Sequence, residues 1–121
     1  MILDEYRKGW ALRYIREAKD ELKTSSQAPQ PLDLVVDASR KAQTSIYFSL
    51  GEPSLIGSLV SEVSEAVDFV ENPVLRCLTG IERTLRQMER KPGLSPEKSL
   101  KRAREIVWAA SEILQTVFSD D

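Results

Sequence analysis

The amino-acid sequence predicts an all-α fold, a single-domain up-and-down bundle of four to five helices, from three observations. First, apolar residues near the C-terminus recur at alternating intervals of four and three positions, which places each set on one face of a helix. The two sets are Val74, Leu78, Ile81, Leu85 and Met88, then Leu100, Ala103, Val107, Ala110, Leu114 and Val117. Second, Pro92 and Gly93 separate the sets, which predicts an antiparallel helical hairpin. Third, no stretch shows the alternation typical of strands.

The N-terminal half predicts two further helices. The first, over residues 3–24, has an apolar face formed by Leu3, Tyr6, Trp10, Tyr14, Ala18 and Leu22, widened by Ala11 and Ile15. Two prolines then exclude a continuous helix and predict a loop over 24–31. The second helix, over 33–50, has a core stripe of mostly small residues, namely Val35, Ala38, Ala42, Ile46 and Ser49. Leu34 and Phe48 point elsewhere, so this helix is apolar on several sides, as is typical of a central helix.

Three more helices are expected over 54–71, 73–90 and 96–118. The first of these has a stripe of Ile56, Leu59, Val60, Val63, Val67 and Val70, and Asn72–Pro73 ends it. Gly80 lies inside the next helix at a cost of about 1 kcal/mol relative to alanine, so either a close contact compensates or the helix bends. The sequence Ser95-Pro96-Glu97 is a strong start for the last helix.

Composition indicates one soluble globular domain spanning residues 1–121. Apolar residues make up 41% and charged residues 30%, while the net charge is only −2. No apolar run is long enough to span a bilayer, and the first residues lack the pattern of a signal peptide. Cys77 is the only cysteine, so it has no partner within the chain. We therefore expect a cytoplasmic protein that does not contact membranes.

The chain contains no histidine. This excludes Ser-His-Asp and Cys-His nucleophile systems, His-ligated zinc and the Glu-x-x-His di-iron motif. The carboxylates of Glu62, Glu65 and Asp68 share a helix face that we expect to be turned to solvent, whereas a bundle metal site needs inward carboxylates. The sequence therefore predicts no catalytic residue, no cofactor and no metal ligand, and we expect that the protein is not an enzyme.

Charge is segregated along the chain. Residues 83–104 contain eight basic and two acidic side chains, whereas residues 52–71 contain five acidic and no basic side chains. This pattern favours three alternatives: a surface that binds phosphates, an association of the acidic helix of one copy with the basic hairpin of another, or a solvated face with intramolecular pairs. The candidate nucleic-acid contacts are Arg83, Arg86, Arg90, Lys101 and Arg102.

Three apolar side chains point away from the predicted core stripes. Trp108 lies on the charged side of its helix, with Lys101, Arg104, Glu105 and Glu112. An exposed tryptophan among charges is a candidate interface anchor, unless another helix or charged side chains cover it. Leu12 and Phe48 are the other interface candidates, either in a dimer seam or in a second contact face inside the bundle.

Two segments resemble the HEPN (higher eukaryotes and prokaryotes nucleotide-binding) helical family. Residues 11–22, ALRYIREAKDEL, are similar to the opening helix of that family. Residues 37–53, DASRKAQTSIYFSLGEP, resemble its second helix, which is rich in small residues and contains Ala-Gln. The same segment also looks like small uncharacterised archaeal proteins.

The resemblance implies a helical fold and a homodimer. Many HEPN proteins are metal-independent ribonucleases that use an arginine followed closely by a histidine, and this chain has no histidine. The resemblance therefore points to the non-catalytic branch, whose members act in binding, assembly or regulation. Our leading hypothesis is a protein-interaction or self-assembly module. The alternative is an RNA- or DNA-binding protein that uses the basic hairpin at residues 83–104.

Overall fold

The computed structural model describes residues 2–25, 31–66, 70–90 and 94–119, and the part of the chain that it describes is helical without strands. The five helices are α1 (Ile2–Ser25), α2 (Pro31–Leu50), α3 (Pro53–Ala66), α4 (Pro73–Glu89) and α5 (Pro96–Phe118). The predicted all-α class is confirmed, and the predicted ends of four helices hold to within two residues. None of the described helices combines the length and the apolar character that crossing a membrane requires.

Local chemistry explains where the last two helices begin. The side chain of Asn72 accepts a hydrogen bond from the backbone N–H of Leu75 at 3.0 Å, and Pro73 occupies the first turn of α4. Ser95 caps α5 in the same way, because its hydroxyl accepts from the N–H of Lys98 at 3.2 Å. Each cap satisfies one of the N–H groups that a helix start leaves without a partner.

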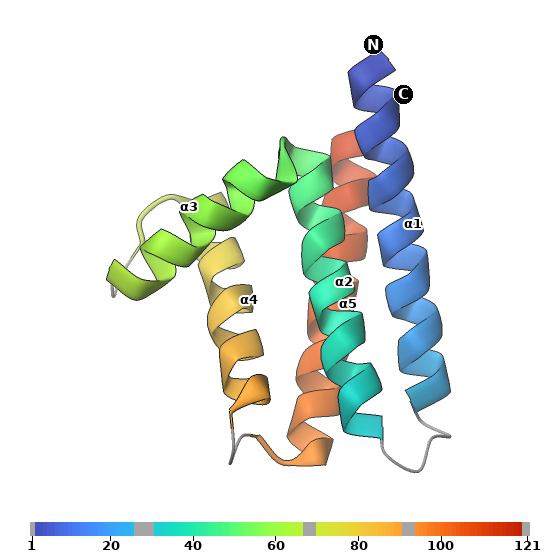
Figure 1. Cartoon of the computed structure of the whole chain (residues 1–121), viewed down its shortest axis with the longest axis vertical. Coiled ribbons are helices and arrows are strands. Elements are labelled where there is room, and N and C mark those ends of the chain that lie inside the picture. Colours follow the sequence, from blue (N-terminus) through green and yellow to red (C-terminus); the bar gives the residue numbers. More distant parts are fainter. Residues whose placement is uncertain (1, 26–30, 67–69, 91–93, 120–121) are drawn as a thin grey trace.

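The third helix is shorter than predicted. We expected it to reach residue 71, but α3 ends at Ala66, and Val70 and Glu71 are not helical. The end of α3 points away from the other helices (Figure 1), so a longer helix would carry Val70 further from them. Instead Val70 lies outside the helix and is 9% exposed, so its side chain is buried against the rest of the molecule.

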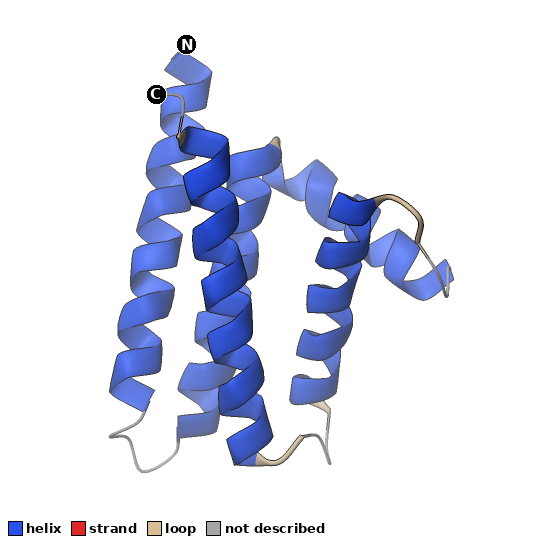
Figure 2. Cartoon of the chain, turned by 180° about the vertical axis from the view of Figure 1, so that it is seen from behind, coloured by secondary structure: helices blue, strands red, loops and turns tan. Residues whose placement is uncertain are grey.

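Three helices form the centre of the molecule. In Figure 1, α2 and α5 run upward beside α1, which runs downward, and α3 slants away from the top of α2. The next helix, α4, runs downward in Figure 1, antiparallel to α5, as predicted for the hairpin. Figure 2 shows the same order from behind, with α1 and α4 on opposite sides of α5. The helix α2 packs against each of the other four, so the prediction of a central helix is confirmed.

Alanines allow the three central helices to approach closely. Six of them are fully buried: Ala11 and Ala18 on α1, Ala38 and Ala42 on α2, and Ala103 and Ala110 on α5. The predicted stripe of α2 is confirmed, since all five of its members are buried. Larger side chains, including Ile46 of α2 and Leu85 of α4, belong to the same hydrophobic core. Interiors packed in this way respond to the loss of even one methylene group.

Other apolar stripes are only partly buried. On α1 the buried face is centred on Ala11 and Ile15, whereas Tyr6 is exposed. On α3, Leu59 is expected in the core but is exposed, whereas the neighbouring Val60 is fully buried. The outer ends of the two C-terminal stripes, Val74 and Val117, are also exposed.

Gly80 faces open space, which gives a testable prediction. No neighbouring atom lies within 4 Å of the position that a Cβ would take there, so the close contact considered above is absent. Changing Gly80 to alanine should raise the free energy of unfolding by about 1 kcal/mol, because alanine restricts the unfolded chain and favours helix. Urea denaturation measures this. Gly9 in α1 has equally open surroundings, so Gly9→Ala is the matched control. A loss of stability in Gly80→Ala but not in Gly9→Ala would show that a Cβ at position 80 meets a close neighbour.

Candidate interaction surfaces

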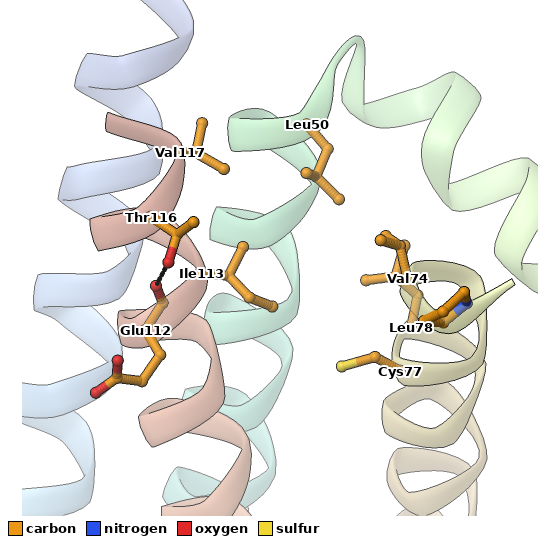
Figure 3. A pocket seen from close by; sticks show the side chains of 9 residues that line it. Leu50, Val74, Cys77, Leu78, Glu112, Ile113, Thr116 and Val117 are labelled. Carbon is orange, nitrogen blue, oxygen red and sulfur yellow. Dashed lines mark hydrogen bonds between the residues drawn. The ribbon is translucent and has the colours of Figure 1, made fainter. Parts of the chain in front are cut away.

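An apolar groove opens between α4 and α5. It encloses about 420 Å³ and lies where the exposed ends of the two C-terminal stripes face each other. Its lining comprises Leu50 of α2, Pro73, Val74, Cys77 and Leu78 of α4, and Glu112, Ile113, Thr116 and Val117 of α5. Val74 is 57% exposed and Val117 is 39% exposed. Figure 3 shows Val74 and Cys77 on one wall, with Ile113 and Val117 on the opposite wall. Exposed apolar surface of this kind is typical of binding sites.

The polar groups of this groove lie at its edge. Glu112 is the single charged residue among the described residues that line it, and Figure 3 shows its carboxylate directed away from the α4 wall. Cys77 is exposed in the groove and also lines a second hollow of about 280 Å³ further along the two helices. There Arg102 and Glu105 form an ion pair with each other at 3.0 Å.

Trp108 lies near the middle of α5 and is 66% exposed. This confirms that it points away from the core. Arg104 and Glu112 lie one helical turn before and after it, so all three share one face of α5. Within the part of the chain that the structure describes, neither Arg104 nor Glu112 forms an ion pair. The tryptophan and its two flanking charges are therefore available to a partner.

The other two interface candidates have neighbours within the molecule. Phe48 stacks on Tyr14 with 5.7 Å between ring centroids and on Trp10 with 6.2 Å. Phe48 therefore contributes to the contact between α2 and α1 within one molecule. Leu12 is 39% exposed and lines a shallow hollow between α1 and α5 together with Leu114 and Phe118.

Several residues of the basic hairpin bind within the chain. Arg86 donates to Ser61 at 3.1 Å and lies 3.6 Å from the Glu65 carboxylate, while Arg83 donates to the Ser64 carbonyl at 3.4 Å. The basic helix α4 therefore meets the acidic helix α3 of the same molecule. Arg90 and Lys101 are exposed. Glu62 and Glu65 are exposed as expected, and Asp68 lies outside the described residues.

A buried carboxylate joins α4 to α2. Glu82 is 9% exposed and accepts hydrogen bonds from Gln43 at 2.7 Å, from Arg86 at 2.7 Å and from Arg40 at 2.9 Å. Arg40 also donates to Glu89 at 3.1 Å. Burial alone would raise the pKa of Glu82, but the hydrogen bonds from Gln43 and Arg86 and the charge of Arg40 outweigh it. Its pKa therefore lies below the ordinary value of 4.5.

Sequence reasoning did not single out this network, although a signal was present. Glu82 directly follows Ile81 and lies four residues after Leu78, so it borders the apolar stripe of α4. Gln43 follows Ala42 and borders the small-residue stripe of α2 in the same way. Polar side chains at the edge of a buried stripe need partners, so the position of each residue indicates a hydrogen bond to a neighbouring helix but does not identify the partner.

A second ionic cluster joins α1 to α2. The ammonium group of Lys41 lies 3.3 Å from the Glu17 carboxylate and 3.4 Å from that of Asp37, and it also pairs with Glu21. The hydrogen bond to Glu21 is the main cause that raises the pKa of Lys41. Among the described residues, no group of three potential metal ligands lies close enough together to hold an ion.

Comparisons of this chain with models of protein families, with curated protein sequences and with solved structures find no match.

Proposed function

We propose that this protein is a non-enzymatic interaction module of the HEPN-like type, which acts in the cytoplasm and self-associates as a homodimer. The observation that carries the proposal is the exposure of Trp108 in the middle of α5, with Arg104 and Glu112 one turn to either side, neither of which forms an ion pair with another described residue. Tryptophan is enriched among the residues that dominate binding energy at protein interfaces. The groove beside it adds further exposed apolar surface on the same helix.

We favour this function over nucleic-acid binding for a structural reason. Arg83 and Arg86 already bind α3, and Arg102 pairs with Glu105. Of the five candidate phosphate contacts, Arg90 and Lys101 are exposed and form no ion pair with another described residue, and two cations give a weak salt dependence. Titration with short single-stranded RNA at low and physiological salt tests the alternative. Tight binding that weakens steeply with increasing salt would favour the nucleic-acid-binding function.

Changing Trp108 to alanine should weaken self-association. We expect the wild-type protein to sediment as a dimer that dissociates on dilution, with the variant needing at least about tenfold higher concentration to dimerise, because buried tryptophan is a frequent hot spot. Sedimentation velocity over a range of concentrations measures both. Trp108 is exposed in the single copy, so the variant should fold normally, and circular dichroism verifies this.

Leu55 offers the matched control, since it is 70% exposed on α3, away from α5. Leu55→Ala should leave the association unchanged. A wild-type protein that stays monomeric at every concentration, or a Trp108 variant that associates as the wild type does, would contradict the proposed function.

A further inference from the structure

We infer that two copies associate through an antiparallel contact between their α5 helices, with a twofold axis beside Trp108. This inference rests on the proposed self-association and specifies its geometry. The partner is a second copy of this chain, and the contact is made by the outer face of α5 that carries Arg104, Trp108 and Glu112.

The sequence spacing on α5 is self-complementary. Arg104 lies four residues before Trp108, and Glu112 lies four residues after it. When two identical helices cross antiparallel with position 108 on the axis, position 104 of one copy lies level with position 112 of the other. Each Arg104 then faces a Glu112 of the second copy, and symmetry produces this pair twice.

The charges also select the direction of the contact. A parallel contact in the same register would place Arg104 against Arg104 and Glu112 against Glu112, which is repulsive in both places. The antiparallel contact removes both repulsions and also opposes the two helix dipoles favourably. Further along, Lys101 lies level with the uncharged Gln115 of the second copy, so no like charges meet there.

The required side chains are free to make this contact. Trp108, Arg104 and Glu112 are all exposed, and no described helix covers that face. The Glu112 carboxylate is turned away from the groove wall formed by α4 (Figure 3), so it does not depend on the groove. Burial of the two tryptophans would supply apolar contact at the centre, with the charge pairs at the edge, as in typical protein interfaces.

Charge reversal tests the arrangement in trans. Arg104→Glu and Glu112→Arg should each weaken homodimerisation by at least about tenfold, because each creates two like-charge contacts. A mixture of the two variants should associate to within about threefold of the wild type, since both contacts between the two different chains are then attractive. Sedimentation velocity of each variant alone and of the equimolar mixture measures this.

Arg90→Glu is the matched control, because it makes the same charge change at an exposed site outside α5. It should leave association unchanged. The inference is supported if the mixture associates and neither variant does so by itself. A folding defect within one chain could not be corrected by adding a different chain. Wild-type dimers that tolerate both reversals, or a mixture that stays monomeric, would overturn this geometry and leave self-association in place. A monomeric wild type would overturn both proposals.

Discussion

Replacing Ile46 by alanine is expected to lower the free energy of unfolding by about 3 kcal/mol, because the side chain is fully buried at the centre of the bundle. Ile46 lies on α2, which packs against every other helix. The truncation removes apolar contacts and leaves a cavity. The surrounding helix backbones are already held close together by alanines, so they cannot move much further inward to fill it.

Urea denaturation followed by circular dichroism measures this effect. Val36→Ala is a suitable control, since Val36 is on the same helix but only partly buried and should lose less stability. Equal losses for both variants, or a loss below about 1 kcal/mol at Ile46, would show that α2 is not the centre of the core.

Replacing Glu82 by alanine is expected to destabilise the protein at pH 7 by about 3 kcal/mol, since three donors lose their shared acceptor. Two of these donors are guanidinium groups that would keep their charge beside the core. Glu62, which is exposed on α3, gives the control variant Glu62→Ala, for which we expect almost no change.

The effect of Glu82 should depend on pH in a defined direction. Its pKa in the folded protein lies below the ordinary value of 4.5. The carboxylate therefore stabilises the folded state above that value, and this stabilisation is lost as the pH falls through the folded pKa. The difference in unfolding free energy between wild type and Glu82→Ala should be largest near neutral pH and shrink below pH 4.5. A difference that stays constant down to pH 3 would contradict the ionic role.

The sequence predicts local structure well and contacts between helices poorly. Caps such as Ser95 and Asn72 act within one turn, so the helix starts follow from adjacent residues. Whether Leu59 is covered depends instead on the angle at which α3 leaves α2, and no short-range pattern encodes that angle. The same holds for Arg86, which helical periodicity places on an outer face but which the slant of α3 brings against Ser61.

The same distinction between features of one helix and contacts between helices applies to the candidate site. The position of Trp108 away from the apolar stripe of α5 could be predicted, because it is a property of one helix, whereas whether another helix covers this side chain could not. The groove could not, because it arises where Val74 and Val117, both in register with buried stripes, lie beyond the reach of the other helices. Periodicity identifies the apolar face of a helix but does not say how far along that face the neighbours extend.

The start of α1 and the end of α5 determine where groups attached to the protein would lie in a dimer. In Figure 1, α1 begins and α5 ends at the same end of the molecule. In the proposed antiparallel pair, the second copy is inverted, so its helix ends lie at the opposite end of the assembly. Each α5 is about 35 Å long at 1.5 Å per residue over its 23 residues. Such a pair would hold a group attached at the start of α1 or the end of α5 of one copy far from the same group on the other copy. The assembly would therefore separate the two attached groups.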